Sequence, residues 1–479
     1  MSIDVLVVRP PQIIEEPSSY RVSGYHIAIT TLLQKVGLES RYFNADFLRK
    51  PSPFQYAPVN IYKKFIEKPE KIKVDFFNEK NKKWRNFRRI FENYDPKSLL
   101  ILPKDVYHVN SSIFLARLSK KINPNIKIGI AGYPSKYFYK NFLNSGVDFV
   151  VVNDLLYTIP LAFKGIIKNK NLNKVPNIVY KKDRKFIFTK KIIATKNLDF
   201  IPIPDRELVI ERKYYPPSSL GDILVSVGCI YNCKFCPLAG SRFLLRSPNN
   251  VVQEIKYVYE KYGTRDFSFE TASINLNRDW LVEFCQEIKK EKLRILWSAY
   301  ANAIGIDESL AKLMKECGCW KLGIGFESGS QKILKKMSKP LRVEDSFKAV
   351  KILKKNKIFV YGSFIAGYPG EEINDLLSTI KLIRGLKPDV FRINLLVPKP
   401  GTPFFNLRKD NNFWEYSSSK VKIKGVNEKT LRELWGDLYP LSVLQEKILF
   451  RKYFLDASIL YLKMSEYIRY FLLNFIYNK

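Results

Sequence analysis

Three cysteines in one short loop constrain this chain more than any other feature. Cys229, Cys233 and Cys236 are spaced C-x3-C-x2-C and directly follow an apolar, strand-like segment at residues 223–227. Thiolates gathered this closely are typical of metal ligation, because sulfur binds zinc and iron–sulfur clusters well. The pattern therefore indicates a metal centre in a reducing compartment and argues against a disulfide scaffold.

Strand and helix patterns alternate regularly from this loop onward. Helical patterns, as at 277–290 and 307–317, follow each of the first five of six strand-like segments: 223–227, 266–269, 295–299, 320–325, 359–365 and 390–396. Six units are too few for the closed eight-fold barrel, so we expect a partial (β/α)6 TIM barrel over residues 221–405. Catalytic groups of such barrels lie at the C-terminal ends of the strands, which is where the cysteine loop falls.

A second α/β pattern precedes the barrel. Helical segments separate short apolar strands at 4–8, 40–43, 98–102, 127–131 and 148–152. This alternation predicts a Rossmann-like domain with a parallel sheet over residues 1–168, whose ligands would bind at the carboxyl ends of the strands. A basic, aromatic run (KNKKWRNFRR at 80–89) predicts an inserted excursion over about residues 50–95, and residues 169–220 predict a linker with a small hairpin.

The kind of metal centre follows from the shortage of further ligands. A structural zinc site needs a fourth protein ligand, and His26 and His108 are the only histidines of the chain. Cys285 lies in a helical pattern typical of a core residue, whereas Cys317 and Cys319 are formal candidates for a fourth ligand or an accessory thiol. Three cysteines suit a 4Fe–4S cluster with one open iron, which can bind a cofactor or substrate.

The cysteine loop and three later segments resemble the radical S-adenosylmethionine (SAM) superfamily. The segments are, in the family's order, 228–236 (GCIYNCKFC), 323–330 (GIGFESGS) with 337–339 (MSK), 364–371 (FIAGYPGE) and 398–403 (PKPGTP). The resemblance implies a 4Fe–4S cluster whose unique iron binds SAM. It further implies one-electron cleavage of SAM to methionine and a 5′-deoxyadenosyl radical, which abstracts hydrogen from an unactivated C–H bond. The cofactor carries this chemistry, while the barrel orients the reactants and excludes water.

The same resemblance implies the site residues. Cys229, Cys233 and Cys236 would be the metal ligands, and the cofactor-binding candidates are Phe235, Glu270, Thr271, Tyr300, Asn302, Glu327, Ser328, Gly367 and Gly370. Glu270 or Thr271 would contact the SAM amino group, although the family more often has Asp or Gly-Gly-Glu there. Tyr300 and Asn302 would contact the ribose, and the two glycines would let the backbone approach the adenosine, unless the Gly-Tyr-Pro-Gly run is only a turn. No catalytic acid or base is assigned.

The front domain resembles the cobalamin-binding domain of the B12-type branch of this superfamily. Four segments carry the likeness: 9–11 (RPP), 131–135 (AGYPS), 147–149 (VDF) and 198–205 (LDFIPIPD). The D-x-H-x-x-G motif is absent, as in much of the branch, and residues 153–156 (NDLL) replace the frequent Gly-Glu-Gly-Glu. The resemblance therefore implies cobalamin as a third cofactor, with a retained fold and weak or lost binding as the alternative.

The charge and the C-terminal segment bear on partners. Lys and Arg number 81 against 46 Asp and Glu, which gives a net charge of +35. Such a charge attracts nucleic acid, anionic lipid or an acidic partner. The alternative is a Lys-rich surface that is only solvated.

Residues 406–479 predict a helical extension, and the basic and aromatic residues of 447–479 suit a helix in a membrane headgroup region or a helix capping the barrel. No segment resembles a signal peptide or spanning helix, so we expect a cytoplasmic protein, peripheral on the cytoplasmic membrane face.

Together these features favour an enzyme acting on a hydrophobic or membrane-lipid substrate. The reaction would be ring or C–C bond formation, or cobalamin-dependent C-methylation, with ferredoxin or flavodoxin as the electron donor. Methyl- or methylthio-transfer to RNA or a protein side chain is the first alternative. It is disfavoured because methylthiotransferases carry three further cysteines in the front domain, and no cysteine precedes Cys229. A non-catalytic iron–sulfur module is the second, and the retained SAM motifs disfavour it.

Overall fold

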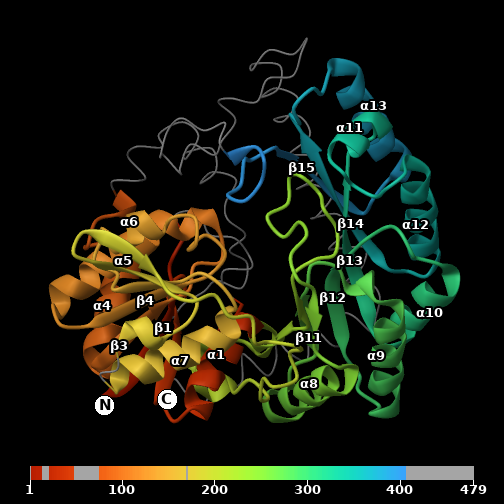
Figure 1. Ribbon diagram of the computed structural model, residues 1–479. Coiled ribbons are helices and arrows are strands. Elements are labelled where there is room, and N and C mark those ends of the chain that lie inside the picture. Colours follow the sequence, from red (N-terminus) through yellow and green to blue (C-terminus); the bar gives the residue numbers. More distant parts are fainter. Residues whose placement is uncertain (1, 13–20, 48–74, 169–170, 406–479) are drawn as a thin grey trace. The chain divides into compact units, whose positions relative to one another are not determined.

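The chain folds into two compact units, residues 1–220 and 221–479. The structure, a computed structural model, describes residues 2–12, 21–47, 75–168 and 171–405 (Figure 1). The predicted helical extension at 406–479 lies outside the described residues. The two units are treated separately below.

The first unit is built on a seven-stranded sheet. Its strand order is β2-β1-β3-β4-β5-β6-β7. The strands are β1 (Ile3–Arg9), β2 (Ser40–Asn44), β3 (Pro96–Ile101), β4 (Lys127–Ala131), β5 (Phe149–Val151), β6 (Ile178–Lys182) and β7 (Lys185–Phe188). Strands β1 to β5 pair in parallel, which confirms the predicted Rossmann-like sheet.

Helices cover both faces of this sheet. Helices α1 (Gly24–Lys35) and α7 (Leu155–Ile167) pack against each other on one face. The opposite face carries α4 (Lys82–Tyr94), α5 (Val109–Ile122) and α6 (Tyr139–Leu143) (Figure 1). The chain runs from β1 to β2 in one direction and then to β3, β4 and β5 in the other. Right-handed crossovers in opposite directions place their helices on opposite faces of a sheet.

Helix α4 corrects the prediction of an irregular excursion. Residues 82–94 form the crossover helix from β2 to β3. Trp84, Phe87, Ile90 and Phe91 recur at helical spacing and are all buried, and the Asn81 side chain caps the helix by accepting a hydrogen bond from the Lys83 amide. The arginines and lysines on its outer face obscured this periodicity in the sequence. Residues 48–74 of the predicted excursion lie outside the described residues.

The small hairpin expected in the linker belongs to the sheet. Strand β6 pairs antiparallel with β5, and β7 pairs antiparallel with β6. Asp154 then fixes the chain that follows, because its carboxylate accepts hydrogen bonds from the amides of Ala194 (2.7 Å) and Thr195 (2.9 Å). This residue stands where the family frequently has Gly-Glu-Gly-Glu, and in this chain it anchors the segment after the hairpin.

The second unit contains the predicted partial barrel. Six parallel strands follow the order β8-β11-β12-β13-β14-β15. They are β8 (Asp222–Leu224), β11 (Asp266–Glu270), β12 (Leu296–Ala301), β13 (Cys319–Glu327), β14 (Phe359–Ala366) and β15 (Val390–Leu395). The fold class predicted for this part of the chain is therefore confirmed.

Helices form a layer on the outer side of the barrel sheet (Figure 1). They are α8 (Pro248–Tyr262), α9 (Arg278–Lys290), α10 (Glu308–Glu316), α11 (Gln331–Lys336), α12 (Val343–Lys355) and α13 (Ile373–Leu386). The core between the two layers includes stacked Phe269 and Trp297, with Phe284 of α9 set edge-on against both rings. Along each strand, every second side chain packs against the helices, and the side chains between them face the barrel interior.

The first barrel strand is shorter than expected. The segment predicted as a single strand at 223–227 divides into β8 and β9 (Ser226–Val227), and β9 pairs antiparallel with β10 (Leu244–Leu245). This small ribbon carries the chain away from the barrel edge and brings it back. The cysteine loop is the connection between its two strands.

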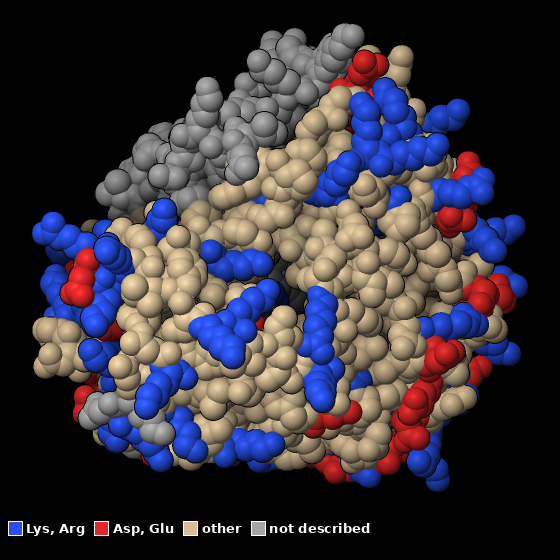
Figure 2. Space-filling model, viewed as in Figure 1, with Lys and Arg blue, Asp and Glu red and all other residues tan. Residues whose placement is uncertain are grey.

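Basic side chains are distributed over the visible face of the molecule and outnumber acidic ones there (Figure 2). Several acidic residues are paired on the surface, as in Lys289–Glu316 and Arg278–Asp307, each at 2.8 Å. Exposed pairs of this kind contribute little to stability. Within the described residues, no helix has the length and apolar character needed to cross a membrane.

Candidate functional site

The cysteine loop is held in a defined shape by its own backbone. The Cys236 amide donates to the Cys233 carbonyl (2.9 Å), and the Cys229 amide donates to the Ser241 hydroxyl (3.1 Å). Gly228 has φ +79°, and a Cβ there would collide with the Arg242 carbonyl oxygen, so the turn into the loop needs glycine. The shape of the loop is therefore set in part by contacts of the chain itself.

Neighbouring segments anchor the loop on both sides. The Lys234 amide donates to the Met337 carbonyl (2.9 Å), which ties the loop to the segment after β13. Phe235 packs beside Met337 in a small apolar cluster. On the return side Arg246 is fully buried, pairs with Glu254 of α8 and donates to the Leu224 carbonyl (3.0 Å). These contacts fix the loop relative to the strand ends.

The three thiols suit a cluster that displaces their protons. Burial raises the pKa of Cys233 to about 11 and also raises the pKa of Cys236. Such thiols are protonated at neutral pH until a metal binds and deprotonates them. No group of three or more His, Cys, Asp or Glu in the described ranges has the geometry of a metal-ion site. A 4Fe–4S cluster, bridged by its own sulfides, holds thiolates further apart than one ion does.

The other cysteines lie away from this loop. Cys285 is a buried core residue of α9, and its sulfur is 2.7 Å from that of Cys317. Cys319 is the first residue of β13, whereas the cysteine loop lies at the C-terminal ends of the strands. The candidacy of Cys317 and Cys319 as a fourth ligand is therefore contradicted by their place in the fold.

The interior face of β13 carries two glycines. Gly323 and Gly325 alternate with Ile324 and Phe326, which are buried beneath the helices. The ring of Tyr300, on the neighbouring strand β12, lies over Gly323, and the residue is 57% exposed. Of the predicted contacts, Tyr300 is the one that presents a large side chain to the interior.

Glu327 closes this face of β13 and forms an ion pair. Its φ is +65°, a conformation rare for a residue other than glycine, and its carboxylate turns back over Gly325. The Nζ atom of Lys339 is 3.2 Å from Glu327 Oε1, and the two side chains are only 11% and 9% exposed. Lys339 is the last residue of the MSK segment, and nothing in the sequence signals its pairing with Glu327.

Three other predicted residues make mainly structural contacts. Asn302 exchanges hydrogen bonds with Asn275 and caps its own turn at Ile304. Ser328 is fully buried and lies 3.2 Å from the Thr379 hydroxyl of α13. The Thr271 hydroxyl is 2.7 Å from that of Ser226 and so links the end of β11 to β9. Glu270, the last residue of β11, lies beside it at the same edge.

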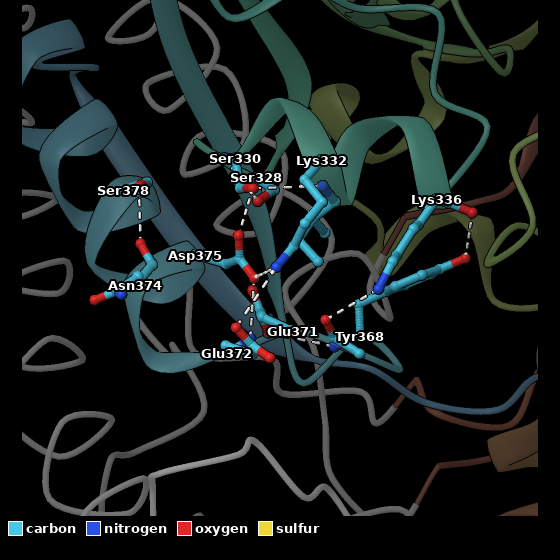
Figure 3. A network of polar contacts seen from close by, with 12 residues as sticks. Ser328, Ser330, Lys332, Lys336, Tyr368, Glu371, Glu372, Asn374, Asp375 and Ser378 are labelled. Carbon is cyan, nitrogen blue, oxygen red and sulfur yellow. Dashed lines mark hydrogen bonds and ion pairs between the residues drawn. The ribbon is translucent and has the colours of Figure 1, made fainter.

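Glu371 fixes the turn at the end of β14, the position predicted to approach the adenosine (Figure 3). One carboxylate oxygen accepts hydrogen bonds from the amides of Gly367 and Tyr368, and Lys336 donates to the Gly370 carbonyl (3.2 Å). Tyr368 in turn donates its hydroxyl proton to the Lys336 carbonyl (2.8 Å). The Gly-Tyr-Pro-Gly run is therefore a turn whose shape is set from beneath by one buried carboxylate.

This carboxylate makes stability depend on pH. Burial raises the pKa of Glu371 to about 7, above its ordinary value of 4.5. Between these values the folded state binds the extra proton, so this group's contribution to stability is present at low pH and is lost as pH rises towards 7. We expect the stability difference between wild type and Glu371→Gln, from urea unfolding, to change across pH 4.5 to 7. A difference that stayed constant across this range would contradict the assignment.

A buried ion group lies at the carboxyl ends of β1 and β2 in the first unit. Asp46 Oδ1 is 2.9 Å from Lys83 Nζ, and Asp46 Oδ2 is 4.0 Å from Arg9. Burial alone would raise the pKa of Asp46, but the two cations lower it below its ordinary value. Arg9 of the RPP segment is thereby held at the strand end.

Two buried polar atoms lie at the same edge of that sheet. Burial lowers the pKa of His108 to about 3, so its ring is neutral. Its Nδ1 accepts a hydrogen bond from the Asp105 amide (3.3 Å), which leaves the proton on Nε2. Among the described residues, neither His108 Nε2 nor the Ser135 hydroxyl has a hydrogen-bond partner. Because buried polar atoms are normally paired, these residues fit a polar ligand such as cobalamin, which carries amide and phosphate groups.

The fold and site define the class first: a two-unit α/β protein with a three-cysteine loop at the mouth of a partial barrel. Residues 223–383 match the radical SAM superfamily. An uncharacterized methyltransferase of Pyrococcus horikoshii is 27% identical over 381 residues, covering 76% of this chain and 83% of that protein. The anaerobic magnesium-protoporphyrin IX monomethyl ester cyclase of Rubrivivax gelatinosus is 26% identical over 303 residues, 60% of this chain and 54% of the cyclase.

A solved structure shares the two-unit architecture. The radical SAM methyltransferase TsrM of Kitasatospora setae, determined with cobalamin and a 4Fe–4S cluster bound, superposes with a TM-score of 0.66 at 16% identity, covering 84% of this chain and 74% of TsrM. Residues 223–383 therefore form a radical SAM domain, and the described chain shares the two-unit fold of TsrM. These matches support a radical SAM enzyme over the alternative of a non-catalytic iron–sulfur module.

Proposed function

We propose that this protein is a cobalamin-dependent radical SAM methyltransferase acting on a hydrophobic substrate. The observation that carries the proposal is the α/β unit ahead of the barrel, which shares its fold with the cobalamin-bound methyltransferase TsrM. Cys229, Cys233 and Cys236 would bind the 4Fe–4S cluster, which supplies the electron that cleaves SAM. His108 and Ser135 would bind polar groups of cobalamin, which supplies the methyl group.

The barrel's own residues would position SAM and the substrate. Glu371 holds the Gly367–Gly370 turn at the carboxyl end of β14 by accepting the Gly367 and Tyr368 amides. Tyr300 lines the interior, and its ring packs directly against Gly323, where a Cβ would collide with it. The exposed side chains of Ile230 (53%) and Leu238 (37%) give the cysteine loop an apolar surface. Exposed apolar side chains beside a reactive centre favour a hydrophobic substrate over a strongly polar one.

Ring or C–C bond formation is the second candidate reaction. The similarity to the magnesium-protoporphyrin IX monomethyl ester cyclase supports it, although the chain spans only about half of that relative's length. The two candidates differ in where the methyl group of SAM goes. Methylation transfers it to the product, whereas ring formation by hydrogen abstraction leaves it on methionine.

The test uses protein reconstituted anaerobically with iron, sulfide and hydroxocobalamin. After desalting, the ultraviolet–visible spectrum should contain both cluster and cobalamin absorption. Incubation with dithionite, methyl-labelled SAM and membrane lipid extract should then give 5′-deoxyadenosine and a labelled lipid. An unlabelled product of changed mass would favour ring formation, no retained cobalamin would overturn the methyl route, and SAM cleavage without any lipid change would overturn the substrate class. Transfer RNA serves as the comparison substrate.

A further inference from the structure

The Glu327–Lys339 ion pair lies inside the second unit and is not explained by packing alone. A Cβ at Gly325 would collide with Glu327 Oε1 and would come within 3.3 Å of Lys339 Nζ. The pair therefore occupies the space that this glycine leaves on the interior face of β13. Two charges so nearly buried cost desolvation energy, which their mutual attraction repays only in part. A buried pair at the mouth of a barrel is a candidate for a functional role.

The backbone places the pair next to the cysteine loop. Lys339 follows Met337 and Ser338, and the Met337 carbonyl accepts the Lys234 amide from within the C-x2-C segment. Ser338 has φ +53°, and the Lys339 amide returns to the Leu334 carbonyl (3.0 Å), so this segment is a closed turn at the end of α11. A short, hydrogen-bonded route therefore connects the cation to the cluster ligands.

We propose that Lys339 and Glu327 set the reduction potential of the cluster held by the three cysteines. This inference rests on the proposed function, since it requires that the loop hold a 4Fe–4S cluster. When one electron enters from an external reductant such as dithionite, the cluster gains one negative charge and no proton. The buried ammonium of Lys339 stabilises that added charge. The Glu327 carboxylate holds the ammonium in place and offsets part of its effect, so the two side chains act in opposite directions.

The test is a redox titration of the reconstituted cluster without SAM, followed by electron paramagnetic resonance. For Lys339→Met we expect a more negative midpoint potential, with the ratio of reduced to oxidised cluster about tenfold lower at the wild-type midpoint. That ratio corresponds to about 59 mV for a one-electron couple. Glu327→Gln, which keeps the shape of the side chain, should shift the potential in the positive direction. Lys339→Arg should stay near wild type, and so should Lys335→Met, the control on the exposed face of α11.

The outcomes separate this inference from the proposed function. If wild type assembles no cluster, the proposed function fails. If the wild-type cluster forms and Glu327→Gln leaves its potential unchanged, the inference is overturned, even where Lys339→Met proves unstable. An unchanged potential in Lys339→Met with a full iron content, combined with weaker SAM binding, would also overturn it and would make Lys339 a SAM contact alone.

Discussion

Replacing Cys233 with alanine is expected to abolish both the cluster and SAM cleavage. Iron content should fall from about four per chain to near zero, because only three protein thiolates are available to bind the cluster. Formation of 5′-deoxyadenosine under dithionite should fall to the level of protein without iron. Cys285, Cys317 and Cys319 lie away from the loop, so we expect none of these thiols to replace the buried Cys233 thiol.

The matched control is Cys319→Ala, in the same unit and equally buried. It should keep its iron and its SAM cleavage and lose only some stability from the small cavity. If Cys233→Ala retained a full cluster, the assignment of the loop as the metal site would be wrong. If Cys319→Ala lost the cluster as completely, the location of the site would need revision.

Arg246→Met is expected to destabilise the second unit by about 3–5 kcal/mol, because it leaves a charge buried without its partner. Arg246 and Glu254 are both fully buried, and Arg246 also donates to the Leu224 carbonyl and to Asn250. The loss should be visible in urea unfolding, read as the transition of this unit, since a two-unit chain need not unfold in one step. Cluster content should fall as well, since Arg246 fixes the return of the cysteine loop.

A double variant separates charge from packing. Arg246→Met combined with Glu254→Leu removes both charges and should recover much of the lost stability, as apolar replacements of buried ion pairs often do. The exposed pair Lys289–Glu316 supplies a comparison, and Lys289→Met there should leave the urea unfolding transition close to that of wild type. A loss below 1 kcal/mol for Arg246→Met itself would mean that water reaches Glu254.

The sequence predicted both sheets because strand and helix periods alternate within a few residues of each other. The sequence-based prediction was wrong or incomplete where an element shows only part of the usual pattern or pairs with a distant strand. Helix α4 buries only one narrow face, and its many basic residues suggested an insertion, although the spacing of Trp84, Phe87 and Ile90 was available as a signal. The hairpin β6–β7 was found, but its pairing with β5 depends on tertiary contacts that local pattern does not encode.

In the site too, local motifs were predictable from the sequence and long-range contacts were not. The cysteine spacing is local and identified the loop directly. The roles of Asn302 and Ser328 could not be read, because whether a polar side chain turns to a ligand or to its own backbone depends on partners from distant elements such as Thr379. Lys339 lies twelve positions beyond Glu327, and their pairing follows from the turn after α11. Spatial partnership of this kind is invisible in a single sequence.

The two glycines of β13 give the barrel two separately adjustable compartments. Gly323 faces the ring of Tyr300, whereas Gly325 faces the Glu327–Lys339 pair. A methyl group introduced at the first position would push the Tyr300 ring aside, and one at the second would displace the Glu327 carboxylate. If Tyr300 contacts the substrate and the ion pair sets the cluster potential, as proposed above, the two substitutions would change substrate selectivity and electron uptake separately. An engineer could then alter one of these properties of the barrel without altering the other.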